Sequence, residues 1–168
     1  LHYFSALPDT DWDGLLDTWE SQGIDINGDG TTDLDLPSLG ANPLHKDIFV
    51  EVDYMQFHTP RADAVNDVIA AFANSPVPNP DGANGINLHV QVDEQVNHQD
   101  SLVIWTGFDA IKNTNFGTAA ERASANAVNI LAAKRLVYHY ALFVHALDLG
   151  CFSGIAELLG NDFIVSLG

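Results

Sequence analysis

The sequence predicts an α/β fold in which an acidic segment precedes a mixed β-sheet with two main helices. Residues 47–55 and 87–93 alternate apolar and other side chains with the period of a strand, and helical spacing of apolar residues lies between and after them. A chain of 168 residues is of ordinary size for one globular unit. We expect residues 1–36 to form tandem acidic loops, 37–46 a linker, and 47–168 an α/β sandwich domain.

The acidic segment from Asp9 to Leu36 contains nine carboxylates and no Lys or Arg. Its first half matches the calcium-loop pattern D-x-[DN]-x-[DN]-G-x5-E with Asp9, Asp11, Asp13, Gly14, Asp17 and Glu20. Calcium takes six to eight oxygen ligands, so alternate residues of a tightly wound loop point inward and the glycine permits the sharp turn. The carbonyl of Leu15 would fill the seventh position of the loop, and Glu20 would close the site with two oxygens.

A second copy of this pattern begins sixteen residues later, with Asp25, Asn27, Asp29, Gly30, the carbonyl of Thr31, and Asp33. Leu36 stands where the closing glutamate belongs, and Asp35 is a possible substitute. The alternative for both copies is a solvated acidic loop, which is what most runs of like charge are. Two copies in register favour calcium instead, and we expect two EF-hand-like calcium sites.

The first strand and helix follow the linker. Residues 47–55, DIFVEVDYM, alternate Ile48, Val50 and Val52 with Phe49, Glu51 and Asp53, as in a strand. Thr59 is expected to cap a helix with Pro60 as its first residue. The apolar residues of this helix recur at helical spacing, and the prolines and glycines of residues 75–85 end it.

The second half of the chain begins with a strand over residues 87–93, with Leu88, Val90 and Val92 inward. Thr118 and Glu121 form a capping box for a second helix that runs to about residue 136. Residues 137–147 are expected to form a strand, although they could continue the helix. A short edge strand at 153–158 and a last strand at 163–167 complete the sheet, and its parallel pairs would be joined through the helices.

Composition limits the classes of partner. The formal charge of −17 disfavours nucleic acid and anionic membranes, and two calcium ions would neutralise only part of it. The sequence contains no run of eighteen apolar residues, so it predicts no membrane span.

The start of the chain and its cysteine content bear on where the protein works. The chain begins at Leu1 without a signal sequence, which suggests a processed or recombinant mature chain. Cys151 is alone, so we expect either a small buried side chain or an intermolecular disulfide. Loops of this type fill best where calcium is millimolar, which favours an extracellular location.

Several segments together resemble a family of secreted prokaryotic zinc-metalloprotease-like proteins. They are the acidic loops, KDIFVEVDYM, NPDGANGINLHVQVDE, RLVYHYALFVHAL and SGIAELLGNDFIVSLG. In this family, thrombospondin-type-3-like calcium loops precede a zincin-type α/β domain, so the resemblance implies a secreted protein with a zincin-like front half. A strand like DFIVSLG is soon followed there by a helix with the H-E-x-x-H motif, which binds zinc and supplies a general base. This sequence has no H-E-x-x-H and ends at Gly168, so no catalytic residue is carried over.

Other chemistry finds little support in the sequence. His139 and His145 would lie roughly 20 Å apart on one strand, too far for one ion, and His89 and His98 are nine residues apart. Cys151 and Ser153 lack the pattern of a nucleophile elbow. We therefore expect no zinc and no peptidase activity in this chain.

Three functions remain open. The chain is expected to be a calcium-binding extracellular module that corresponds to the non-catalytic front half of a metalloprotease-like protein. The alternatives are a self-assembling structural or surface-layer protein stabilised by calcium, and an active zinc metallopeptidase if the polypeptide continues past residue 168. Because the active-site helix would normally cover one sheet face, residues 141–144 and 163–165 are expected to expose apolar surface. That surface would contact the missing C-terminal part or a second copy.

Overall fold

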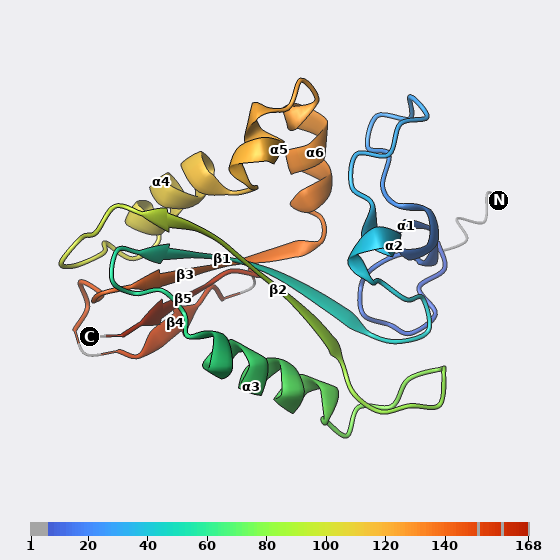
Figure 1. Cartoon of the computed structure of the whole chain (residues 1–168), viewed down its shortest axis with the longest axis horizontal. Coiled ribbons are helices and arrows are strands. Elements are labelled where there is room, and N and C mark those ends of the chain that lie inside the picture. The colour runs from blue at the N-terminus through green and yellow to red at the C-terminus, as the bar shows by residue number, and fades with distance from the viewer. Residues whose placement is uncertain (1–6, 151, 159, 168) are drawn as a thin grey trace.

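The computed structural model describes residues 7–150, 152–158 and 160–167, and its centre is a five-stranded sheet (Figure 1). The strand order is β2-β1-β3-β5-β4. The strands are β1 (Asp47–Met55), β2 (Asn87–Val96), β3 (Tyr138–Val144), β4 (Gly154–Ala156) and β5 (Phe163–Ser166). The helices are α1 (Asp17–Gln22), α2 (Leu36–Leu39), α3 (Ala62–Ala73), α4 (Thr106–Asn115), α5 (Ala119–Ala123) and α6 (Ala127–Lys134).

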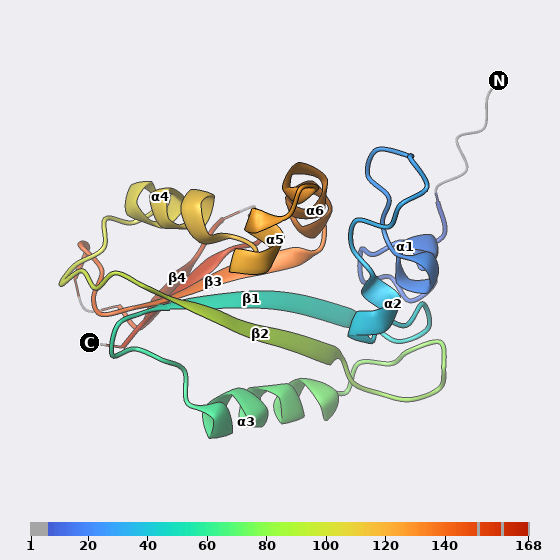
Figure 2. The same ribbon diagram turned by 45° about the horizontal axis from the view of Figure 1, so that its top comes forward.

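The sheet is mixed, which confirms the predicted α/β class. β1 pairs in parallel with β2 and β3, β3 pairs in parallel with β5, and only the edge strand β4 runs antiparallel. Helix α3 connects β1 to β2 on one face, and α4, α5 and α6 connect β2 to β3 on the other (Figure 2). The N-terminal loops with α1 and α2 lie beside the end of the sheet where β1 begins.

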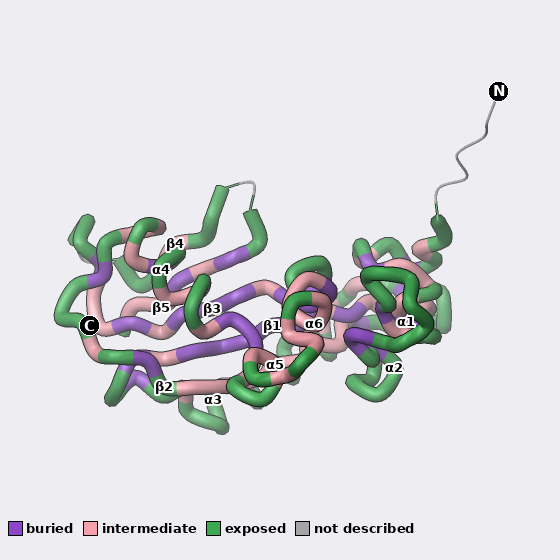
Figure 3. The backbone as a smooth tube through the Cα atoms, turned by 90° about the horizontal axis from the view of Figure 1, so that it is seen from above, coloured by how far each residue is buried: buried purple, intermediate pink, exposed green. Residues whose placement is uncertain are grey.

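We call the two sides of the sheet the α4–α6 face and the α3 face. On β1, Phe49, Glu51 and Asp53 point to the α4–α6 face, while Val50 and Val52 point to the α3 face. Both faces of β1 are largely covered, so the strand is buried along nearly its whole length (Figure 3). A strand that is buried on both faces needs apolar side chains, and apart from Asp47, Glu51 and Asp53 the side chains of β1 are largely apolar.

The main hydrophobic core lies on the α4–α6 face. Phe108 and Phe116 from the helical connection pack on Tyr140 of β3, with ring centroids 5.5 and 6.0 Å apart. The acidic N-terminal segment contributes to the same core through Leu15, Ile24, Leu34 and Leu36. The loops are therefore held on the sheet by apolar contacts as well as by polar ones.

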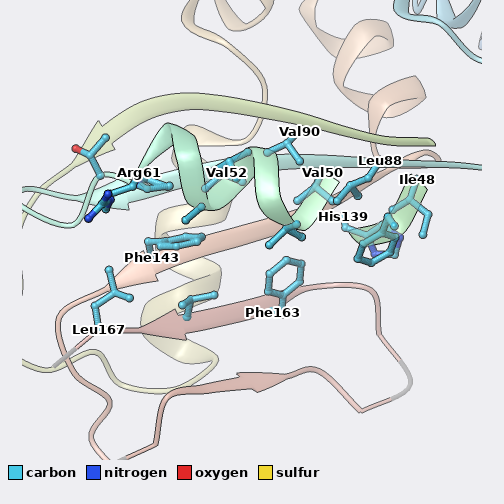
Figure 4. A pocket seen from close by; sticks show the side chains of 17 residues that line it. Ile48, Val50, Val52, Arg61, Leu88, Val90, His139, Phe143, Phe163 and Leu167 are labelled. Carbon is cyan, nitrogen blue, oxygen red and sulfur yellow. The ribbon is translucent and has the colours of Figure 1, made fainter. Parts of the chain in front are cut away.

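The α3 face is less completely covered. Helix α3 has no fully buried residue, and half of the Val68 side chain is exposed. Between this helix and the strands lies an apolar groove of about 640 Å³, shown in Figure 4. Phe143, Phe163 and Val165 from β3 and β5 form part of its floor.

Several sequence-based predictions need correction. Helix α3 begins at Ala62, after Arg61, so Thr59 and Pro60 precede the helix. The predicted helix from Thr118 to residue 136 is two helices, because the chain extends at Ser124 between α5 and α6. The capping box of Thr118 and Glu121 is present. The sequence does not predict helix α4, because it contains few apolar residues. The connection between β2 and β3 therefore contains three helices where one was expected.

Two further expectations concern exposure. Ala141, Leu142 and Val144 are fully buried, so the expected apolar exposure of β3 is wrong for these residues. Val92, expected to point inward, is 40% exposed, and its strand β2 is one of the two edge strands of the sheet. The first residues of the predicted linker are helical, because residues 36–39 form α2, which packs against α1. Cys151 and Gly168 lie outside the described residues.

No helix in the described part of the chain is long and apolar enough to cross a membrane.

Candidate metal centre

The first acidic loop is wound by its own side chains. The carboxylate of Asp9 accepts hydrogen bonds from the backbone N–H groups of Trp12 and Gly14, at 2.8 and 3.1 Å. That of Asp13 accepts from Leu15 at 2.7 Å. Gly14 has φ of +98°, a left-handed backbone that glycine adopts without strain. The helix α1 that follows then directs Glu20 back toward the loop.

Five carboxylates converge as a result, and we call them the first-loop site. Ligand oxygens of Asp9, Asp11 and Asp13 lie within 4.8 Å of one another. Those of Asp13, Glu20 and Asp47 also lie within 4.8 Å of one another. Asp13 belongs to both groups and links them, and within each group the three oxygens are close enough to share a cation.

Asp47 is the member that the sequence pattern does not include. It is the first residue of β1, and its side chain is fully buried. Its backbone N–H donates to Asp13 at 2.8 Å, and its carboxylate accepts from the N–H of Asn42 at 2.8 Å and contacts the ring of His89. The calcium-loop motif ends at Glu20, and only the acidic residue at the start of an apolar strand signals this position in the sequence.

The first-loop site is short of positive charge. Glu20 is 1% exposed, and neither of its carboxylate oxygens has a hydrogen-bond partner among the described residues. Asp11 is equally buried, and its Oδ2 also has no such partner. The nearest lysine, Lys46, donates to the backbone carbonyl of Asp11. Buried carboxylate oxygens without partners are costly, and a bound cation would remove that cost.

The raised pKa values of these carboxylates reflect the same lack of positive charge. Burial, with the charges of Asp13 and Asp11, raises the pKa of Glu20 to about 8. Burial next to Asp13 raises the pKa of Asp11 to about 6. Burial also raises the pKa of Asp13, against the hydrogen bonds from Asp47 and Leu15. Without a metal ion, the site would therefore hold protons that a divalent cation could replace.

One predicted ligand of the first loop, Asp17, is placed differently, whereas the predicted carbonyl of Leu15 is not contradicted. Asp17 does not join the converging carboxylates, because it accepts hydrogen bonds from the N–H and hydroxyl of Thr10, both at 2.7 Å. The side chain of Leu15 is part of the hydrophobic core, and only its backbone is available to the loop.

The second loop repeats the turn of the first. Asp25 accepts from the N–H groups of Gly28 and Gly30, both at 2.7 Å, which correspond to Trp12 and Gly14. Asp29 accepts from Thr31 at 2.8 Å, as Asp13 does from Leu15, and Asn27 accepts from Asp29 at 3.0 Å. The two loops therefore share a backbone framework as well as a sequence pattern.

The second loop nevertheless differs from the first in its exposure and in the residues at its closing end. Asp25, Asn27 and Asp29 are exposed, and none of them belongs to a converging group of three carboxylates within the described residues. Asp33 is buried and accepts from Ile26 and Asn126. Asp35 caps α2 by accepting from Ser38 at 3.2 Å.

A third acidic group, Glu51, Asp53 and Asp93, lies on β1 and β2 at the α4–α6 face. Here the charge is compensated. The fully buried Lys134 lies 2.6 Å from Glu51, and the hydroxyl of Tyr140 donates to Asp53 at 2.6 Å. This group differs from the first-loop site in containing a buried cation, although Oδ2 of Asp93 also has no hydrogen-bond partner among the described residues.

Comparison of the chain with protein-family models, curated proteins and solved structures found no match. The functional assignment therefore depends on the geometry of the acidic centre.

Proposed function

We propose that the protein is a calcium-binding extracellular module in which an ion at the first-loop site fastens the N-terminal loops to the α/β domain. The buried, unpaired oxygens of Glu20 and Asp11 are the main support. All five side chains of the site are carboxylates, and ligands made only of oxygen favour hard cations such as calcium over zinc. A second ion is proposed for the loop of Asp25, because its turn has the same hydrogen bonds.

The position of Asp47 gives this ion a structural role. Asp9, Asp11 and Asp13 belong to the loop, Glu20 to α1, and Asp47 to the central strand β1. One ion bound by all three segments would cross-link parts of the chain that are otherwise joined by a few hydrogen bonds and apolar contacts. Millimolar extracellular calcium would keep such a site filled.

The order of the chain supports the relationship to secreted metalloprotease-like proteins. Acidic loops lead directly into a mixed sheet, as the resemblance implies. We propose that this region is the zincin-like front half of such a protein. The sequence contains no H-E-x-x-H motif, so we assign no peptidase reaction to it.

Thermal melts with and without excess chelator test the calcium proposal. Calcium bound only by the folded state at a hundredfold above its dissociation constant adds about 2.7 kcal/mol of stability. The melting temperature should therefore rise clearly with calcium, and much less with magnesium, which demands a smaller octahedral site. An unchanged melting temperature on addition of calcium would refute the proposal.

The groove on the α3 face supports self-assembly as a second candidate. It is lined almost wholly by apolar side chains, including Val68, Phe143 and Phe163. A second copy of the chain that covers it would remove this surface from water. The two candidates are compatible, because the groove and the first-loop site involve different residues.

A further inference from the structure

Three histidines meet at the edge of the sheet where the parallel strands end. His58 follows β1, His98 follows β2, and His145 directly follows β3. These three strands are neighbours, and their carboxyl ends lie together (Figure 1). The ring centroids are 5.6 Å apart for His58 and His98, 5.2 Å for His58 and His145, and 5.3 Å for His98 and His145.

The hydrogen bonds around the three rings determine which nitrogens are free to bind a ligand. Nδ1 of His58 lies 2.9 Å from the carbonyl oxygen of Gln56, which can only accept, so Nδ1 carries the hydrogen and Nε2 has the lone pair. Nε2 of His98 lies 3.2 Å from a carboxylate oxygen of Asp100, which leaves the lone pair on Nδ1. That Nδ1 is buried and has no hydrogen-bond partner in the described part of the chain.

The remaining nitrogen pair is already close. Nε2 of His58 lies 3.1 Å from Nδ1 of His145. Two nitrogens bound to one tetrahedral zinc ion at 2.0–2.1 Å are separated by about 3.3 Å, and their ring centroids by about 5.2 Å. The nitrogens of His58 and His145 are near the first distance and the three centroid pairs are near the second, but no choice of one nitrogen from each ring brings all three within 4.8 Å of one another. A turn of the partly exposed ring of His98 about its side-chain bonds would direct Nδ1 toward the other two.

We propose that His58, His98 and His145 form a binding site for one divalent transition-metal ion of the zinc class. Neutral imidazole nitrogens suit zinc, copper and nickel, whereas calcium prefers oxygen. The contact of His58 with a carbonyl is of the kind that orients a metal-binding histidine through its second ring nitrogen. Three nitrogen ligands leave a fourth position of a tetrahedral ion open for water or another ligand.

Other features of this edge agree with a binding site. His58 is only 7% exposed, so its ring is held in place by the surrounding protein. Phe57, the residue before it, has φ of +72°, and backbone strain of this kind concentrates at functional sites. In open α/β sheets, ligands bind outside the carboxyl ends of the strands, which is where these histidines lie.

This site is separate from the first-loop site. Asp47 begins β1 and His58 follows its end, so the nine-residue strand places the two about 30 Å apart. The sequence predicts no zinc site because His139 and His145 lie far apart on one strand and His89 and His98 are nine residues apart. His58, His98 and His145 are far apart in the sequence, and the pairing of β1 with β2 and β3 brings them together.

The test is a titration of the whole chain with Zn²⁺ by isothermal calorimetry, with millimolar calcium present throughout to fill the acidic sites. We expect one zinc per chain with a dissociation constant in the micromolar range or below. Co²⁺ as a spectroscopic probe should show the intense visible bands of a tetrahedral site, and zinc should remove them.

Matched variants locate the ion. His98→Gln and His145→Gln should each weaken zinc binding at least tenfold, while His139→Gln should leave it unchanged. His139 lies on β3 outside the group, where its Nδ1 contacts the carbonyl of Asn161. His98 is partly exposed, so its variant should fold even if that of His145 does not, and the calcium-dependent melt checks folding.

Two results would overturn the proposal. One is the absence of zinc binding by the folded chain at millimolar Zn²⁺. The other is zinc binding that is equally strong in His98→Gln and in the unmodified chain, since the ion would then be held elsewhere. Neither result affects the calcium proposal, because that is measured without zinc.

Discussion

Asp17 and Glu20 lie one turn apart on α1, yet their carboxylates have opposite environments. Asp17 receives two hydrogen bonds from Thr10 and is partly exposed. Glu20 is buried with both oxygens unpaired and a pKa raised to about 8. The motif counts both as ligands, but the structure gives only Glu20 the unsatisfied charge that a cation would stabilise.

The variant Glu20→Gln should therefore weaken calcium binding by roughly tenfold or more, because it removes both a negative charge and a bidentate ligand. It should also leave the calcium-free protein as stable as before, or more stable, at pH 8. Competition with a chromophoric chelator measures the affinity, and thermal melts measure the stability. Asp17→Asn is the matched control on the same helix, and an equal loss of affinity in that variant would contradict the assignment.

The raised pKa values of Glu20 and Asp11 predict how the calcium-free protein responds to pH. The folded state keeps protons to about pH 8 on Glu20 and about pH 6 on Asp11, whereas the unfolded chain releases them near 4.5 and 3.8. The folded state thus binds more protons in this window, so these groups lower the free energy of unfolding as pH rises from about 5 to about 8.

Urea unfolding in chelator at several pH values measures this slope. Glu20→Gln should flatten it between pH 6 and pH 8, because the group that titrates there is gone. Calcium should also flatten it, since the ion replaces the protons. A slope that is the same in the variant and the unmodified chain would show that other groups cause it.

At the scale of elements, β1 organises the acidic chemistry of the protein. Along one face it carries Asp47 in the first-loop site, Glu51 paired with Lys134, and Asp53 bonded to Tyr140. The same strand thus contributes one carboxylate to a site that needs an external cation and another to a site with an internal one. The difference arises because α6 places Lys134 over Glu51, while Lys46 beside the first-loop site donates to the backbone carbonyl of Asp11 and forms no salt bridge with its carboxylates among the described residues.

Lys134→Met should destabilise the protein by about 3–5 kcal/mol, because it leaves the charge of Glu51 buried without its partner. Lys134 also contacts Glu121 at 2.8 Å, which adds to the loss. Urea unfolding at neutral pH gives the value. The double variant Lys134→Met with Glu51→Leu should recover much of the stability, and no recovery would mean that the pair matters through packing rather than charge.

At the scale of the whole molecule, the two faces of the sheet are unequally covered. Three helices and the acidic loops pack on one face, whereas in the described part of the chain α3 is the one helix over the other face, beside the groove of about 640 Å³. Extended apolar surface on a soluble protein marks contact sites. The net charge of −17 opposes the association of two copies, and calcium and salt reduce that repulsion.

We accordingly expect the chain to self-associate at micromolar concentration in millimolar calcium, with the groove of one copy covered by another. Val68→Glu, on α3 beside the groove, should shift sedimentation velocity profiles toward the monomer. Val128→Glu is the matched control, because Val128 is 82% exposed on α6 at the other face. A clean monomer of the unmodified chain would contradict the expectation.

The sequence by itself determined the features that depend on local spacing. The alternation in residues 47–55 and 87–93 identified the two long strands, Thr118 and Glu121 identified a helix start, and the acidic repeats identified two loops with the same turn. These signals are local because a strand, a cap and a tight turn are each defined by side chains a few residues apart.

Only the tertiary structure decided which of these residues meet. It brought Asp47 to Asp13 and Glu20, directed Asp17 to Thr10, and placed Lys134 against Glu51. It also gathered His58, His98 and His145 from the ends of three strands. Contacts of this kind depend on strand order and on the path of the connecting helices, and a pattern within one segment contains no information about either.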